Sequence, residues 1–109
     1  MSHDEKRALA ANLLLERVEM KRDIALIKAE LAKKAELLIK FGGLLRSNPH
    51  VVDIDDQPMT SDYAQRAQKF SSEELDAKRI AALVEELRTK TDKLTAAEQQ
   101  IRAMGYPLD

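Results

Sequence analysis

The sequence contains no cysteine and no tryptophan, and its 109 residues include only three glycines and three prolines. The absence of cysteine excludes a disulfide framework, thiolate catalysis and cysteine-ligated zinc. Long apolar runs are missing too, because the first apolar cluster, residues 8–15, is interrupted by Asn12 and preceded by Asp4 and Glu5. Such a cluster is too short to span a membrane and makes a poor signal peptide, so we expect a cytoplasmic protein.

The chain also lacks an excess of charge of one sign. Its 18 Lys and Arg residues stand against 19 Asp and Glu residues, for a formal net charge of −1. No overall field therefore draws it to nucleic acid or to an anionic membrane. The basic residues between positions 21 and 40 are interleaved with Asp23, Glu30 and Glu36. This mixed pattern is typical of a solvated helix and argues against a nucleic-acid partner.

Groups suited to catalysis are scarce. The chain has two histidines, His3 and His50, and neither has an evident serine or carboxylate partner on a rigid element. The pair Gly42-Gly43 lacks the lysine and the spacing of a phosphate-binding loop. The sequence therefore predicts a protein that is not an enzyme.

An acidic cluster follows His50. Its members Asp53, Asp55 and Asp56 supply oxygen atoms of the kind that bind Ca²⁺ or Mg²⁺. The spacing lacks the glycine and the distal glutamate of an EF-hand loop. We therefore interpret the cluster as a solvated acidic loop and expect neither a metal site nor a cofactor.

The sequence is rich in residues that favour helices. With 34% charged residues and few helix breakers, residues 4–46 predict one long helix, which Ser47-Asn48-Pro49 would end. A second helix is predicted over residues 72–104, with Ser71 as N-cap and Glu74 completing a capping box. Gly105 is expected to end it, which leaves a short tail, residues 105–109.

The predicted connector between these helices, residues 47–70, is too long for a tight turn between helices. We expect it to be partly structured, with residues 50–54 extended and a short helix over residues 61–69. Residues 1–109 are expected to form a single all-α domain.

Both long helices carry an apolar heptad repeat that predicts an antiparallel coiled-coil hairpin, although an amphipathic helix shows part of the same pattern. Lys34 and Lys90 interrupt it, and we interpret them as side chains that cover leucine while the ammonium group reaches water. The predicted hairpin seam consists of Met20, Ile24, Ile27, Leu31, Leu38, Phe41, Ile80, Leu83, Leu87, Leu94 and Ile101.

The register follows from requiring that the two seams face each other. Pairing residues whose numbers sum to about 121 achieves this and places Glu30 near Lys93 and Lys21 near Glu98. A parallel homodimer through the first helix is the alternative, because it also brings opposite charges together.

The first helix has apolar residues that an isolated hairpin leaves uncovered. They predict a helical-bundle homo-oligomer, most simply a dimer, unless the N-terminal part folds against the connector instead. The predicted oligomer or partner interface consists of Leu9, Leu13, Leu14, Leu15, Val18, Ala25, Ala32 and Ile39.

The function predicted from these features is that of a non-enzymatic coiled-coil interaction protein: a scaffold, adaptor or assembly subunit that binds itself and another protein. A small helical-hairpin chaperone, or holdase, that uses the apolar N-terminal part of the first helix is the alternative. A coiled coil associated with nucleic acid is a third, less favoured hypothesis.

Overall fold

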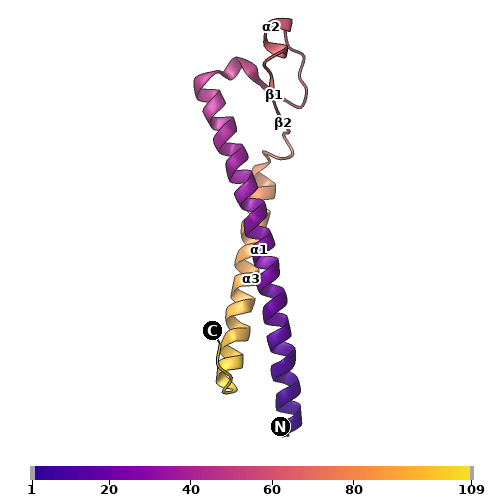
Figure 1. The fold of residues 1–109 in the computed structure, drawn as a ribbon, viewed down its shortest axis with the longest axis vertical. Helices are drawn as coiled ribbons and strands as arrows, with labels where there is room; N and C mark the ends of the chain where they lie inside the picture. The colour runs from indigo at the N-terminus through magenta and orange to yellow at the C-terminus, as the bar shows by residue number, and fades with distance from the viewer. Residues whose placement is uncertain (1, 109) are drawn as a thin grey trace. The chain divides into compact units, whose positions relative to one another are not determined.

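The computed structural model describes residues 2–108, and most of them are helical (Figure 1). This confirms the predicted predominance of α-helix and the presence of two long helices. In chain order the elements are α1 His3–Ser47, a 3₁₀ turn at Pro49–Val51, β1 Val52–Ile54, α2 Ser61–Ala64, β2 Gln68–Phe70 and α3 Ala77–Ala103. No helix within residues 2–108 is long and apolar enough to cross a membrane.

The ends of α1 have local causes in the sequence. At its start, the amide of Glu5 donates to the Ser2 hydroxyl at 3.2 Å, and the Glu5 carboxylate lies 3.4 Å from the Ser2 amide. This reciprocal capping box was not predicted, although its Ser-x-x-Glu spacing is visible in the sequence. At its end, the helix stops before Asn48 and Pro49, as predicted.

Helix α3 begins at Ala77, later than the expected residue 72. The N-cap is Asp76, whose carboxylate accepts a hydrogen bond from the Lys78 amide at 2.9 Å. The predicted cap, Ser71, instead accepts a hydrogen bond from the Glu73 amide at 3.2 Å in the turn that precedes the helix. A local turn therefore competes with the predicted capping box for the same serine hydroxyl.

The C-terminal end of α3 is the predicted one. Gly105 adopts a positive φ of 89°, and its amide donates to the Arg102 carbonyl at 2.9 Å. The Tyr106 amide reaches back to the Ile101 carbonyl at 3.3 Å. These two bonds form a Schellman motif, whose left-handed position favours glycine.

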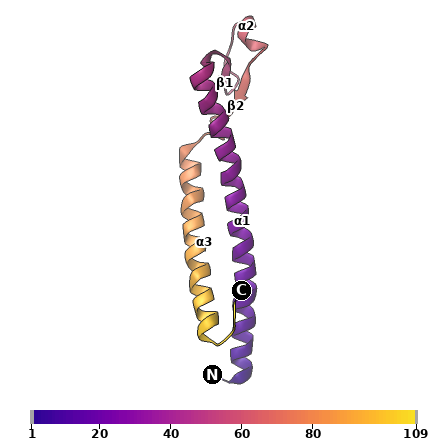
Figure 2. The same ribbon diagram turned by 60° about the vertical axis from the view of Figure 1, so that its left-hand side comes forward.

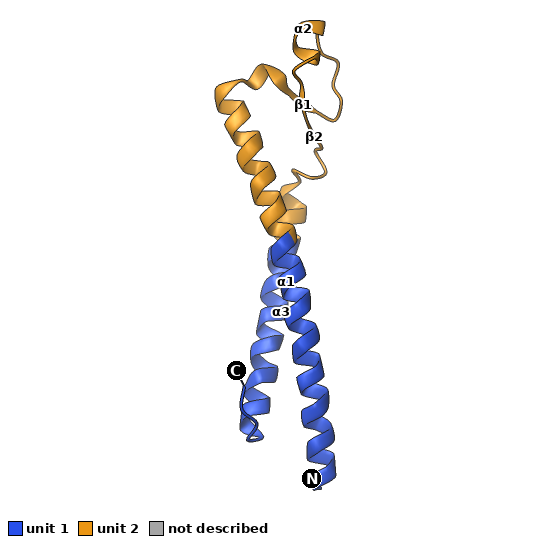
Figure 3. Cartoon of the chain, viewed as in Figure 1, with its two compact units in different colours: residues 1–29, 83–109 blue, residues 30–82 orange. Residues whose placement is uncertain are grey.

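The chain divides into two compact units, residues 1–29 with 83–109 and residues 30–82 (Figure 3). In the first unit, the N-terminal part of α1 and most of α3 lie side by side (Figure 2). Arg17 lies 3.6 Å from Glu98, and Asp23 lies 3.1 Å from Lys90. The later residue of α1 therefore pairs with the earlier residue of α3. The buried apolar side chains of this unit are Ala10, Leu13, Ile24, Ile27, Leu83, Ala97 and Ile101.

The ion pairs correct the predicted register. Glu98 pairs with Arg17 in place of the expected Lys21, so the numbers of paired residues sum to less than 121. In the second unit, Glu30 pairs with Arg79 at 3.3 Å, and these residue numbers also sum to less than 121. The predicted register came from requiring the apolar seams to face each other, which a repeating heptad allows in more than one alignment, and exposed ion pairs contribute only about 0–1 kcal/mol each toward choosing between them.

The second unit contains the connector. Strands β1 and β2 pair in parallel, with Val52 opposite Gln68 and Ile54 opposite Phe70. Phe70 is buried, and its ring packs edge-on against Phe41 of α1 with centroids 5.0 Å apart. The parallel pair was not predicted, and α2 is shorter than the expected helix over residues 61–69 because residues 68–70 form β2.

Candidate functional site

Large exposed apolar side chains within residues 2–108 are confined to α1. The large apolar residues of α3, by contrast, are buried or half-buried. The exposed set consists of Leu14, Leu15, Val18, Leu26, Leu38, Ile39 and Leu45. Helix α1 therefore presents more apolar surface than this chain itself covers, and its exposed face is the candidate site.

In the first unit, the exposed residues form what we call the outer stripe: Leu14, Leu15, Val18 and Leu26. The side chains of Val18 and Leu26 are 62% and 63% exposed, whereas Ile24 is buried. Because successive helical residues turn by about 100°, Val18 and Ile24 lie about 120° apart around the helix axis. The outer stripe is thus a second apolar face, separate from the face that carries Ile24 and Ile27.

The predicted interface residues divide between these two faces. Leu13 is buried, and Leu9 is half-buried, so neither is part of the exposed surface. The shifted register brings α3 further along α1 toward Leu13 than predicted, as the pair between Arg17 and Glu98 indicates. The remaining predicted interface residues are exposed: Leu14, Leu15, Val18, Ala25, Ala32 and Ile39. Leu26, which was not predicted, joins them.

The predicted seam residues have graded burial. Ile24, Ile27, Leu83 and Ile101 are buried. Those that are half-buried are Met20, Leu31, Phe41, Ile80, Leu87 and Leu94. Leu38 is exposed, and Phe41 packs against Phe70 of the connector.

The two lysines that interrupt the heptads both reach polar partners. Lys90 lies 3.1 Å from the Asp23 carboxylate in the first unit. In the second unit, the Lys34 ammonium group donates to the Glu74 backbone carbonyl at 3.4 Å. The ammonium group of each lysine is therefore engaged within its own unit.

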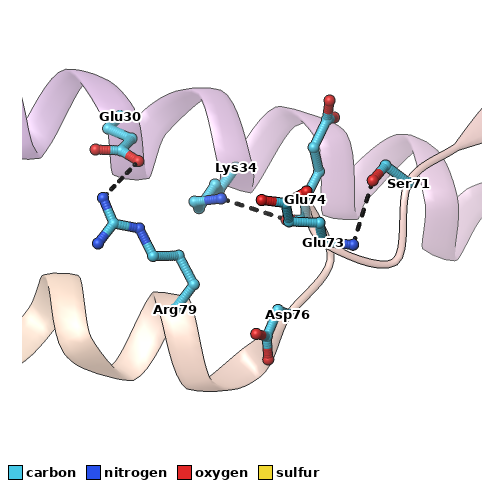
Figure 4. A pocket seen from close by; sticks show the side chains of 7 residues that line it. All are labelled: Glu30, Lys34, Ser71, Glu73, Glu74, Asp76 and Arg79. Atoms are coloured by element: carbon cyan, nitrogen blue, oxygen red, sulfur yellow. Dashed lines mark hydrogen bonds and ion pairs between the residues drawn. The ribbon is translucent and has the colours of Figure 1, made fainter.

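A polar hollow of about 500 Å³ lies in the second unit between α1 and the start of α3 (Figure 4). Its lining consists of Glu30, Lys34, Ser71, Glu73, Glu74, Asp76 and Arg79. Both of its cations are engaged, Arg79 with Glu30 and Lys34 with the Glu74 carbonyl. The Asp76 carboxylate caps α3. These groups join the turn before α3 to α1, and this structural role accounts for them.

The acidic side chains of the loop, Asp53, Asp55 and Asp56, also make contacts within the chain. Asp53 is buried and accepts a hydrogen bond from the Gln57 amide at 2.8 Å. Asp56 lies 3.0 Å from the Lys69 ammonium group, and Asp55 accepts a hydrogen bond from the Ser72 amide at 2.9 Å. Asp55 and Asp56 have positive φ angles of 57° and 54°, a conformation that aspartate tolerates better than most residues.

Two of these contacts shift pKa values. Hydrogen bonds from the Ser72 side chain and backbone lower the pKa of Asp55, because they favour the charged carboxylate. The hydrogen bond to Asp56, with its negative charge, raises the pKa of Lys69. Both pKa shifts arise from contacts that close the loop, so these charged side chains stabilise the loop's conformation.

Within residues 2–108, no three His, Asp or Glu side chains come together in a geometry that could hold a metal ion.

Comparisons of the chain with protein-family models, with curated proteins and with solved structures found no match. Inference about function therefore depends on the chemistry of the exposed surfaces.

Proposed function

We propose that this chain is a non-enzymatic interaction protein: an antiparallel coiled-coil hairpin that associates with itself and binds another protein through the exposed apolar face of α1. This proposal rests on one observation: within residues 2–108, the large exposed apolar residues all lie on α1. Two ion pairs, Arg17 with Glu98 and Asp23 with Lys90, support the hairpin, because their order requires helices that run in opposite directions.

The exposed apolar side chains of α1 give a physical reason to associate. Burying a leucine or valine side chain fully contributes about 1.5–3 kcal/mol relative to leaving it in water. Val18 and Leu26 lie two turns apart on one side of α1 and are both mostly exposed. A helix face that repeats apolar residues at this spacing fits the groove of another helical surface.

The simplest assembly is a dimer of hairpins in a four-helix arrangement. Closed two-fold symmetry is the commonest solution for soluble homo-oligomers. It also removes exposed apolar area from both copies at once, which a narrow two-helix core cannot do alone.

Thermal unfolding at several protein concentrations tests self-association. If the folded form is a dimer, the Tm followed by circular dichroism at 222 nm rises with concentration, because association stabilises only the folded state. We expect an increase of several degrees over about a hundredfold range of concentration. A Tm that stays constant over this range would contradict the self-association that we propose.

The chaperone hypothesis uses the same apolar surface but predicts a different result. A holdase suppresses the aggregation of an unrelated unfolded protein at near-stoichiometric ratios. The burial of Leu13 reduces the surface that the N-terminal part of α1 offers to such a client. We therefore expect no suppression of client aggregation, and strong suppression would favour the chaperone.

A further inference from the structure

The last turns of α1 carry an apolar seam whose side chains are exposed within the described residues 2–108. Ala35, Leu38, Gly42 and Leu45 follow one another at spacings of three, four and three residues, so they share one face of the helix. All four residues are exposed, and Leu38 and Leu45 are 39% and 48% exposed. We call them the free seam.

The connector packs against α1 beside the free seam. Phe70 packs against Phe41, and the Lys40 ammonium group lies 5.9 Å from the centre of the Phe70 ring. At about 100° per residue, Phe41 lies about 100° from Gly42 but only about 40° from Leu45 around the helix axis. The connector therefore borders the free seam at Phe41, and the four seam residues themselves remain exposed.

We propose that the free seam is the contact between two copies of this chain, which meet antiparallel about a two-fold axis near residue 40. This inference rests on the self-association proposed above and assigns it to a particular surface. The outer stripe then remains available for another protein.

The order of side-chain sizes along the free seam selects a second copy as its occupant. In an antiparallel pair whose residue numbers sum to about 80, Leu38 faces Gly42 of the partner subunit, and Leu45 faces Ala35 of the partner subunit. A large side chain thus meets a small one in every layer of the contact. A two-fold interface must be self-complementary in this way, since the same patch serves both copies.

A parallel pair lacks this complementarity. It places leucine against leucine in two layers and glycine against glycine in another, which leaves a void beside Gly42. The antiparallel pair fills that space with Leu38 of the partner subunit. The seam positions also carry no charge, and the neighbouring lysines are directed elsewhere, Lys34 to the Glu74 carbonyl and Lys40 to the Phe70 ring.

The two adjacent glycines of α1 provide a matched pair of variants. A Cβ atom added at either Gly42 or Gly43 would meet nothing within 4 Å in the chain itself. Both positions are helical and exposed, so Gly42→Glu and Gly43→Glu change the net charge equally and are compatible with the monomer fold. Only Gly42 lies on the free seam, because Gly43 is turned away from it by about 100°.

Sedimentation measures the effect of each glutamate on association. We expect Gly42→Glu to raise the dimer Kd by at least about tenfold, because it places a charge against Leu38 of the partner subunit. We expect Gly43→Glu to change the Kd by less than about twofold, since its side chain stays in solvent. Circular dichroism of both variants at low concentration verifies that the helices are intact.

Disulfide trapping tests the direction of the contact in a chain that has no cysteine of its own. Ala35→Cys and Leu45→Cys proteins are prepared separately, mixed in equal amounts and oxidised. A disulfide requires Cα atoms about 4.4–6.8 Å apart, which the antiparallel contact provides only between position 35 of one copy and position 45 of the other. We expect the mixed disulfide dimer to form in the mixture and neither protein to cross-link alone.

The outcomes separate this inference from the proposed function. A wild-type chain that dimerises while Gly42→Glu leaves its Kd unchanged would overturn the free-seam contact and leave self-association standing. Disulfides that form within each single-cysteine protein alone would overturn the antiparallel arrangement in favour of a parallel one. A wild-type chain that stays monomeric would overturn both proposals.

Discussion

At the scale of single residues, position around the helix decides whether an apolar side chain stabilises the fold or remains free to bind. Ile101 is 0% exposed, whereas Leu26 is 63% exposed, although both are large aliphatic residues of long helices. The sequence predicted Ile101 as a seam residue, and Ile101 is fully buried. It did not identify Leu26, because that residue lies outside both the predicted seam and the predicted interface.

This contrast predicts unequal effects of truncation. We expect Ile101→Ala to lower the free energy of unfolding by about 2–5 kcal/mol, because it leaves a cavity in a fully covered site. We expect Leu26→Ala to change it by less than about 0.5 kcal/mol. Urea unfolding followed by circular dichroism, at a concentration where the chain is monomeric, measures both. Equal losses in the two variants would show that our assignment of the covered face is wrong.

At the scale of elements, helices that end at local signals were predictable and contacts between distant segments were not. Pro49 ends α1 and Gly105 ends α3 through backbone effects that act within a few residues. The parallel pairing of β1 with β2 joins segments about fifteen residues apart and uses backbone hydrogen bonds, to which side-chain periodicity is a weak guide. The sequence therefore predicted an extended stretch but not its partner.

The start of α3 illustrates competition between two local signals. The sequence predicted Ser71 as the cap, but in the structure Asp76 caps α3 through the Lys78 amide. We expect Asp76→Ala to destabilise the fold by about 0.5–2 kcal/mol, because the first amides of α3 lose their acceptor.

The matched control is Ser71→Ala, which removes only the exposed contact with the Glu73 amide. We expect it to cost less than Asp76→Ala in the same urea titration. A larger loss for Ser71→Ala would indicate that the helix begins at the turn after all.

At the scale of the whole molecule, the sequence predicted that α1 has more apolar surface than one chain can cover, but it misplaced part of that surface. The expected register left Leu13 uncovered and paired Phe41 with Ile80, whereas Leu13 is buried and Phe41 packs against Phe70. The exposed residues at the other end of α1, Leu38 and Leu45, were missed as a binding surface for the same reason. When one helix slides along another, different leucines are left uncovered. The apolar heptad positions of the two helices still face each other almost as well.

The central claim is that the chain associates with itself, and the molar mass in solution tests it most directly. Sedimentation equilibrium of the wild-type chain at micromolar concentrations should give a mass approaching twice the 12.3 kDa of one chain. A mass that stays at 12.3 kDa throughout this range would contradict the account.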